Sequence, residues 1–405
     1  MSISKIAQSI KEPATLRLTK EANRLKAKGE PVIHLGTGEP KSKVPIDAIR
    51  SCITKLETAE VRYTPTEGIA SLLEAIRNYT GQNYRQNIDA ENIIATTGAK
   101  QSFYTLMMTI LDPHDEVIIF SPYWVSYPDI VRICQGTPVI IGPVEGSFVP
   151  AMSDISKSVN SKTKAIVLNS PNNPSGAVYP EELIQEIVEF CEKKQIYLVM
   201  DDIYHKLVFD NVTVANCYDY TSLDFEESRL VILNGISKLY AMTGFRIVWA
   251  VGNRKLIRAM INMASQNFSC PSAINQAAAV GALNGDQSVV ESLRLKLENN
   301  RNVMTDALAT IKGVKLVAPK GTFYCLPDFS FYNKSSQALA EMLLKQVMVV
   351  TIPGIEFGME GHLRLSVCGS PEEIKEGVAR IRWLVDPDSP AEIVIGERRM
   401  TRDRS

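Results

Sequence analysis

The stretch Asn234-Gly-Ile-Ser-Lys-Leu-Tyr-Ala-Met-Thr-Gly-Phe-Arg246 follows an apolar, β-rich run, Arg229-Leu-Val-Ile-Leu233. This pattern predicts a strand that ends in a glycine-bounded turn with one lysine, Lys238, and with Arg246 further along the same loop. A lysine amine can form a Schiff base with an aldehyde, and an arginine can bind phosphate through its planar fork. The alternative is an ordinary surface lysine after a strand, so the interpretation depends on the motifs that accompany it.

Two polar motifs follow other apolar runs of the chain. Asn169-Ser-Pro-Asn-Asn-Pro-Ser-Gly176 comes directly after a predicted buried strand, and its Asn-Pro and Ser-Gly pairs favour a turn. The run Ile196–Met200 leads straight into the acidic pair Asp201 and Asp202, with Tyr204 close behind. A helix cap or a solvated strand end is the alternative for Asp201, and we expect Asp202 to be such a residue.

Three further segments carry residues suited to phosphate, ring and carboxylate binding. Ile93-Ile-Ala-Thr-Thr-Gly-Ala-Lys-Gln-Ser-Phe-Tyr104 predicts a strand, a glycine turn and a helix, and the amides of a helix N-terminus bind phosphate. Phe120-Ser-Pro-Tyr-Trp124 places an aromatic ring past another strand, where core packing is the alternative. His362-Leu-Arg-Leu-Ser366 sets Arg364 in a half-buried strand pattern, so it needs a carboxylate partner; an internal salt bridge is the alternative.

In this order, from about Lys5 to about Pro387, the motifs resemble those of the class I/II aspartate aminotransferase family, in its bacterial aspartate/prephenate-type branch. Members of this family are pyridoxal phosphate (PLP)-dependent aminotransferases of fold type I. The resemblance implies the type I PLP-dependent transferase fold, an α/β fold with a mostly parallel central sheet in a large domain and a smaller α+β domain. It also implies a homodimer with an active site shared between subunits, because Tyr63, in Val61-Arg-Tyr-Thr-Pro-Thr-Glu-Gly68, matches a tyrosine that reaches the neighbouring subunit's phosphate.

The resemblance also assigns a role to each candidate residue. Lys238 forms the Schiff base and then acts as base and acid, Asp201 keeps the pyridine nitrogen protonated, and Tyr204 hydrogen-bonds the cofactor's O3′. The cofactor-binding residues implied are Tyr63, Gly98, Ala99, Lys100, Trp124, Asn173, Asp201, Tyr204, Ser237, Lys238 and Arg246. The substrate-binding residues implied are Gly38, Lys100, Trp124, Asn173 and Arg364.

The choice of substrate depends on Lys100, which matches a lysine that faces a distal carboxylate. This match favours aspartate and glutamate with oxaloacetate, 2-oxoglutarate and, as a further acceptor, prephenate; the alternative is an exposed first-turn lysine. A PLP-dependent carbon–sulfur β-lyase, a cyclising synthase and an aromatic or neutral amino acid aminotransferase of the same fold stay open. A PLP-sensing regulator fits less well. Two departures from the family pattern are Lys41-Ser-Lys43, which stands after Gly-Glu-Pro, and Gly235, where many members have serine.

Composition excludes several other classes of protein. The 405 residues have a net charge of −1 and 45% hydrophobic content. The chain therefore lacks the excess of positive charge that would attract nucleic acids or anionic membranes. No apolar run has the length of a membrane span, and the beginning of the sequence lacks the apolar core of a secretory signal. Seven scattered cysteines and four histidines indicate a reducing cytoplasm and no metal site. We therefore expect a cytoplasmic enzyme of amino acid metabolism with small-molecule partners.

The order of apolar and amphipathic runs predicts four parts. Residues 1–45 form an N-terminal segment that joins the small domain, residues 46–285 the large PLP-binding domain, residues 286–385 the small C-terminal domain, and residues 386–405 a tail. We expect the end of this tail, Glu397–Ser405, to be solvated or frayed. The expected strands of the large domain are Glu116–Phe120, Pro138–Ile141, Lys164–Leu168, Ile196–Met200, Leu230–Leu233 and Ile247–Val251, with helices such as Glu181–Lys194 and Asn253–Gln266 between them. Buried strands that alternate with helices predict a doubly wound parallel sheet, with ligands at the carboxyl ends of its strands. The strands expected elsewhere are Pro31–Leu35, Val314–Val317, Phe323–Cys325 and Val347–Ile352, with a closing helix over Pro371–Leu384.

Overall fold

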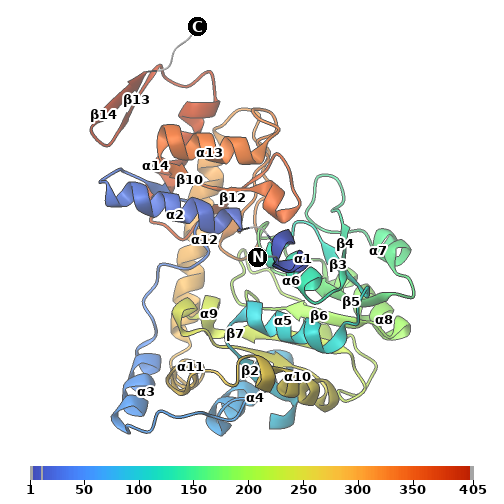
Figure 1. The fold of residues 1–405 in the computed structure, drawn as a ribbon. Coiled ribbons are helices and arrows are strands. Elements are labelled where there is room, and N and C mark those ends of the chain that lie inside the picture. Colours follow the sequence, from blue (N-terminus) through green and yellow to red (C-terminus); the bar gives the residue numbers. More distant parts are fainter. Residues whose placement is uncertain (1–2, 11, 402–405) are drawn as a thin grey trace.

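A seven-stranded sheet forms the centre of the larger part of the molecule (Figure 1). The computed structural model describes residues 3–10 and 12–401. The strand order is β2-β8-β7-β6-β5-β3-β4; the five strands from β7 to β4 are parallel, and β8 runs antiparallel to both of its neighbours. The strands are β2 (Ile93–Thr96), β3 (Glu116–Phe120), β4 (Thr137–Ile141), β5 (Thr163–Leu168), β6 (Tyr197–Asp201), β7 (Leu230–Gly235) and β8 (Val248–Val251). The predicted mostly parallel α/β sheet is therefore confirmed.

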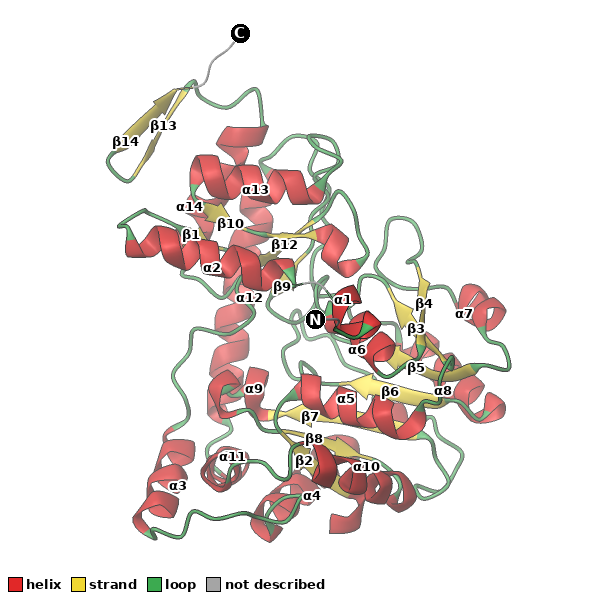
Figure 2. Cartoon of the chain, in the orientation of Figure 1, coloured by secondary structure: helices red, strands yellow, loops and turns green. Residues whose placement is uncertain are grey.

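Helices cover both faces of this sheet (Figure 2). Buried side chains alternate along the strands, so Val117 and Ile119 pack on one face while Ile118 and Phe120 pack on the other. The first face is covered by α5 (Ala99–Ile110), α6 (Ser126–Ile133) and α10 (Arg254–Asn267). The second is covered by α4 (Ala70–Tyr84), α7 (Met152–Ser158), α8 (Glu181–Lys194) and α11 (Ala273–Asn284), with α3 (Ile46–Glu57) packed on α11. Of the seven strands, only β4, at one edge, has exposed residues, whereas β2 at the other edge is buried.

The C-terminal region contains longer helices and short strands. Its elements are α12 (Ser288–Ala309), β9 (Tyr324–Cys325), α13 (Ser336–Val347), β10 (Val349–Val350), β11 (Ile352–Pro353), β12 (Leu363–Ser366) and α14 (Pro371–Val385). The N-terminal elements α1 (Lys5–Ser9), α2 (Ala14–Ala27) and β1 (Ile33–His34) precede the large sheet in sequence, and β1 pairs with β10. The remaining short elements are α9 (Ile236–Leu239) and the 3-10 turns η1 (Ala90–Asn92), η2 (Cys217–Asp219), η3 (Thr243–Phe245) and η4 (Gly354–Phe357). The closing helix α14 matches its prediction, because Ser370 and Glu373 form a capping box with Pro371 at the first helical position.

Four sequence predictions outside the large sheet need correction. The strand expected over Val347–Ile352 is instead the end of α13 followed by the two short strands β10 and β11, which belong to different sheets. Only two residues of Pro31–Leu35 form a strand, because β10 offers only two partners. The segment Val314–Val317 is not a strand: it makes a single bridge between Lys315 and Asp328, and Pro327 on the facing segment has no N–H to extend the ladder.

The tail is a further correction: its described end, residues 397–401, is mostly exposed as predicted, but it is not frayed. A hairpin of β13 (Glu392–Ile395) and β14 (Arg398–Thr401) forms there, because Ile395 packs into the core and Gly396 adopts a φ of +60° at the turn. The hairpin projects at the end of the molecule that is far from the large sheet (Figure 1). The end of the predicted tail, Arg402–Ser405, lies outside the described residues.

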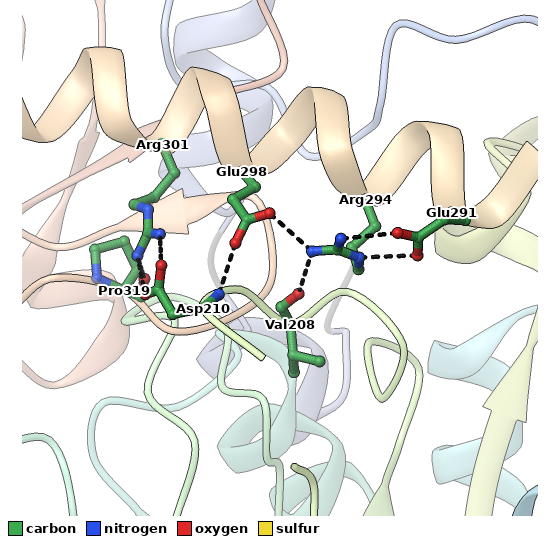
Figure 3. A network of polar contacts seen from close by, with 7 residues as sticks. All are labelled: Val208, Asp210, Glu291, Arg294, Glu298, Arg301 and Pro319. Atoms are coloured by element: carbon green, nitrogen blue, oxygen red, sulfur yellow. Dashed lines mark hydrogen bonds and ion pairs between the residues drawn. The ribbon is translucent and has the colours of Figure 1, made fainter. Parts of the chain in front are cut away.

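A charged network ties α12 to the loop that follows Tyr204 (Figure 3). The guanidinium of Arg301 donates to both carboxylate oxygens of Asp210, at 2.9 and 2.6 Å, and to the carbonyl of Pro319 at 2.9 Å. Arg294 donates to Glu298 at 2.9 Å and to the carbonyl of Val208 at 3.3 Å. Arg301 is only 4% exposed whereas the Asp210 side chain is 56% exposed, so the guanidinium is buried while its carboxylate partner faces water, and the pair joins α12 to this loop.

Candidate active site

The candidate residues meet at one edge of the large sheet because of how its strands run. Asn169 and Asp201 stand at the carboxyl ends of β5 and β6, and Lys238 lies three residues past the end of β7. Arg246 precedes β8, and since β8 is antiparallel to β7, its beginning lies at that same edge. The topology thus brings together residues that are far apart in sequence, as expected for ligand sites in open α/β sheets.

A cavity of about 460 Å³ opens at this edge. Of the thirteen candidate residues, eleven line it: Gly38, Ala99, Lys100, Trp124, Asn173, Asp201, Tyr204, Ser237, Lys238, Arg246 and Arg364. Gly98 lies directly behind the cavity wall, since a Cβ on it would come within 2.0 Å of the Arg246 guanidinium. Tyr63 is not brought into the cavity: its side chain is 92% exposed and lines a separate cavity beside α3 and α11.

The amine of Lys238 is held in the centre of this cavity. Its Nζ donates to the carbonyl of Gly38 at 2.7 Å. Burial lowers the pKa of Lys238 to about 8; Cys368 and Glu39 act to raise it, while Arg364 and Arg246 act to lower it. A lysine with a lowered pKa has a larger fraction of neutral amine, which is the nucleophilic and basic form.

Asp201 supplies a buried carboxylate on the floor of the cavity. Its side chain is 6% exposed, accepts a hydrogen bond from the Tyr127 hydroxyl, and forms no ion pair with a lysine or arginine of the described residues. Burial raises the pKa of Asp201, while Tyr127 and the backbone amide of Ile203 lower it. Such a buried carboxylate needs a cationic partner, and a protonated ring nitrogen would be one.

Arg364 is oriented but left without an anion. It is 4% exposed and donates to Asn173 Oδ1 at 3.2 Å and to the carbonyl of Gly36 at 3.1 Å. Its guanidinium lies 4.4 Å from the centre of the Tyr324 ring, and its buried Nε has no hydrogen-bond partner. The internal salt bridge that was the alternative does not form among the described residues, so Arg364 is available for the carboxylate of a ligand.

The other end of the cavity has donors suited to a phosphate. Gly98 is the N-cap of α5 at a φ of +102°, and no side chain caps this helix. Arg246 reaches the same place, and the buried hydroxyl of Ser237 has no hydrogen-bond partner. Amides at a helix N-terminus, a guanidinium and a hydroxyl together make a phosphate site.

Lys100 lies at the mouth of the cavity on the first turn of α5. Its Nζ is 5.8 Å from the centre of the Trp124 ring. Partial burial lowers its pKa, and the neighbouring Arg246 lowers it further. An ammonium group beside another cationic side chain is well placed to meet an anionic ligand.

Asp202 differs from its prediction, because it is a buried residue and not a solvated strand end. It is 4% exposed, its Oδ1 has no hydrogen-bond partner, and burial raises its pKa to about 7. Behind it, His205 Nε2 lies 2.9 Å from the Tyr79 hydroxyl, and the Asn234 amide donates to the Tyr84 hydroxyl at 2.7 Å. Apolar packing around this network lowers the pKa of His205 to about 3, so the imidazole is neutral.

Several residues of the site were not predicted from the sequence. Tyr127 follows Trp124 by three positions, the spacing of one helix face, and this was the only signal for it. The amide of Asn169 donates to the carbonyl of Asp201 at 2.7 Å. Asn169 begins the motif Asn169–Gly176, from which only Asn173 was predicted as a site residue. The stacking of Tyr324 on Arg364 had no signal in the sequence.

The fold and the position of the lysine define the class: this is the type I fold of the PLP-dependent transferases. The chain belongs to the family of class I and II aminotransferases, whose family model matches residues 30–381. It is 36% identical to the aspartate aminotransferase of Bacillus subtilis over 398 residues, with 96% of this chain and 100% of that protein covered. It is 37% identical to the aspartate/prephenate aminotransferase of Nitrosomonas europaea over 403 residues, with 95% and 100% covered.

Solved structures agree with this assignment. The aspartate aminotransferase of Rhizobium meliloti superimposes with a TM-score of 0.90 at 33% identity, with 95% of this chain and 99% of that chain covered. The Thermus thermophilus aspartate aminotransferase with maleate gives a TM-score of 0.89 at 33% identity, with 94% and 99% covered. The chain is thus an aminotransferase, as the motif order predicted, and its family uses PLP.

Proposed function

We propose that this aminotransferase holds PLP on Lys238 and moves an amino group between aspartate or glutamate and a 2-oxo acid. The observation that carries the proposal is a set of partnerless groups in one cavity: Arg364 Nε and Ser237 Oγ without hydrogen bonds, and Asp201 without a cation. A phosphorylated pyridine aldehyde and an amino acid carboxylate would satisfy all three.

The residues present fit this cofactor. Arg246, Ser237, Gly98 and Ala99, together with Tyr63 of a second subunit, would hold its phosphate. Asp201 would accept from its ring nitrogen, Trp124 would cover its ring, and Asn173 and Tyr204 would contact O3′. When bound, PLP supplies an electron sink for the pair released at the substrate Cα.

Three side chains of the protein have separate roles in the reaction. Arg364 binds the α-carboxylate with help from the Gly38 backbone, which fixes Cα beside Lys238. Lys238 Nζ removes the proton from Cα and returns it later, and its pKa of about 8 leaves much of the amine neutral near that pH. Asp201, supported by Tyr127, stays ionised opposite a positive ring nitrogen because the two charges compensate each other.

An acidic substrate is supported by the charge at the cavity mouth. Lys100 lies beside Trp124 and lines the same cavity as Arg364, so it would meet a distal carboxylate of a substrate that Arg364 holds by its α-carboxylate. The most similar relatives include enzymes named aspartate and aspartate/prephenate aminotransferase, and one solved relative holds maleate, a dicarboxylate. These names support aspartate, glutamate and their oxo acids, with prephenate as a further acceptor to be tried.

The test is a single-turnover half-reaction with the PLP form of the enzyme and each of several amino acids. The expected result is conversion of the cofactor to its amine form, with one oxo acid released per site, and loss of this conversion by several powers of ten in Lys238→Ala. Release of pyruvate and ammonia without the amine form would instead indicate a β-lyase. Retained transamination in Lys238→Ala would refute the proposal.

We also propose a homodimer that completes the site. Tyr63, fully outside its own cavity, lies near α3, where Ile46, Ile49 and Ile53 are 56%, 39% and 49% exposed. An exposed apolar helix face beside a surface cavity is suited to a second copy of the chain. The division at residues 45, 285 and 385 and the cytoplasmic location stay predictions; among the described residues, no helix is long and apolar enough to cross a membrane.

A further inference from the structure

His34 connects the N-terminal helix to the substrate side of the cavity. It ends β1 and lines the cavity together with Thr15, Leu16 and Thr19 of α2. Its Nε2 lies 3.3 Å from Thr19 Oγ1, and its Nδ1 accepts from the backbone amide of Gly36 at 3.2 Å. No role for this histidine followed from the motifs of the sequence.

The direction of each hydrogen bond is fixed by its partners. The Gly36 amide can only donate, so Nδ1 of His34 carries no proton, and the proton of the neutral ring must be on Nε2. Nε2–H therefore donates to Thr19 Oγ1, whose own hydrogen goes to the carbonyl of Thr15 at 2.7 Å. Burial, followed by the nearby charge of Lys26, lowers the pKa of His34 to about 4, so this arrangement persists at neutral pH.

Both ends of this chain of hydrogen bonds touch the reacting part of the site. The Gly36 carbonyl accepts from Arg364 at 3.1 Å, and two residues further along, the Gly38 carbonyl accepts from Lys238. At the other end, Thr15 and Leu16 form the first turns of α2 in the cavity wall, and Leu16 is 54% exposed.

Packing brings α2 against the wall of the cavity. Leu18 and Ala22 form a small core with Ile352 and Val350, and Val125 packs against it. Val125 follows Trp124, so α2 approaches the wall where Lys100 and Trp124 face the ligand. The position of α2 therefore decides how much room remains around a substrate side chain.

We propose that His34 is a positioning residue: it holds the first turns of α2 against the Gly36–Gly38 loop, and so sets how closely α2 contacts the side chain of the substrate. The inference rests on the proposed transamination and concerns the discrimination between substrates. The bond to Thr19 carries the constraint to α2, and the bond from Gly36 fixes the tautomer in which Nε2 can donate to Thr19.

Replacing His34 by asparagine or by glutamine tests its hydrogen bonds to Gly36 and Thr19 one at a time. In His34→Asn the amide oxygen can replace Nδ1 as acceptor but cannot reach Thr19, whereas in His34→Gln the amide nitrogen can replace Nε2 as donor. Thr19→Val keeps the shape of the side chain and removes the same α2 bond from the other side. His34→Asn and Thr19→Val should therefore behave alike, and the double variant should be no worse than either.

The readout is the half-reaction with aspartate, glutamate and alanine. We expect KM for aspartate and glutamate to rise about two- to tenfold in His34→Asn and Thr19→Val, the effect of one neutral hydrogen bond. The KM for alanine should change less, because its side chain ends before α2. The rate at saturation and the affinity for PLP should match wild type, and His34→Gln should recover most of the loss.

Three results would overturn the inference: unchanged KM values in all variants, additive losses in the double variant, or an equal loss of PLP affinity, which would indicate a general folding role. Hydrogen exchange of the amides in residues 15–20 needs no activity, and it should be faster in His34→Asn and Thr19→Val than in wild type or His34→Gln. A wild-type enzyme without any half-reaction would refute the proposed function, and the exchange data would still decide the role of His34.

Discussion

Replacing Asp202 by asparagine should stabilise the folded protein in a pH-dependent manner. The buried Asp202 carboxyl has a pKa raised from 3.8 to about 7, first by burial and further by the charge of Asp201, against a hydrogen bond from Tyr84. In the unfolded chain this carboxyl loses its proton near pH 4, whereas in the folded protein it keeps the proton until about pH 7. Raising the pH through this window therefore favours the unfolded state, and Asp202→Asn removes that effect.

The size of this loss in unfolding free energy follows from the difference between the pKa of Asp202 in the unfolded and in the folded protein. At about 1.4 kcal/mol per pH unit, a pKa rise from 3.8 to about 7 corresponds to at most about 4 kcal/mol, fully developed above pH 7. For a chain of 405 residues this free energy corresponds to a shift in Tm of about 5 °C. His205, whose pKa is lowered to about 3, acts in the opposite direction, because its stabilising contribution is lost as the pH falls below about 6.5.

The assay is thermal unfolding of the PLP-free protein, wild type and Asp202→Asn, at one protein concentration from pH 4.5 to 8.5. The Tm of the variant minus that of wild type should increase steadily up to about pH 7 and then level off. If the new amide destabilises the protein equally at every pH, the Tm difference is lower throughout but depends on pH in the same way. The contribution of His205 to the Tm difference cancels because both proteins contain this residue. A difference that is flat with pH, or that decreases, would refute the assignment of Asp202 as a buried carboxyl whose pKa is raised in the folded protein.

Four further outcomes are expected. The rate at which the PLP-free enzyme takes up PLP should rise about tenfold per pH unit up to the pKa of Lys238 near 8 and then flatten, since the neutral amine reacts; a rate that falls with pH would contradict this. Mixing inactive Tyr63→Phe and Lys238→Ala subunits should restore activity in hybrid dimers, and no recovery by activity assay would argue against a shared site. Lys100→Ala should lower kcat/KM for aspartate and glutamate about ten- to a hundredfold while leaving alanine nearly unchanged; a uniform loss would assign Lys100 to the cofactor. Tyr127→Phe should weaken PLP binding about tenfold, measured by equilibrium titration, because Asp201 loses the hydrogen bond that favours its charged form, and unchanged affinity would refute this role.

Much of the large sheet could be predicted because its strands are buried on both faces. Runs such as Lys164–Leu168 and Ile196–Met200 are continuously apolar, and the polar residues that follow them had to lie at one edge of the sheet. The weaker predictions concern segments whose conformation depends on a partner. Val314–Val317 has the composition of a strand, yet the segment facing it cannot continue the ladder.

Burial of individual polar residues could not be predicted from local pattern. Asp201 and Asp202 are adjacent, and an alternating strand would expose one of them; Asp202 is buried because Tyr84, from α4, closes over its face of the sheet. The hydrogen bond between Tyr127 and Asp201 joins residues 74 positions apart, and the Arg364 bond to Asn173 joins residues 191 apart. Contacts of this range follow from the topology, which the sequence specified only in outline.

The network on α12 has a consequence for how substrates enter. Arg301 and Arg294 fasten α12 to Asp210 and to the carbonyl of Val208 through several hydrogen bonds. The N-terminal segment meets the loop after β7 through separate single bonds, such as those of Lys238 with Gly38 and of Thr243 with Glu39. We therefore expect any relative movement that admits a substrate to break these single bonds before it disturbs the network on α12.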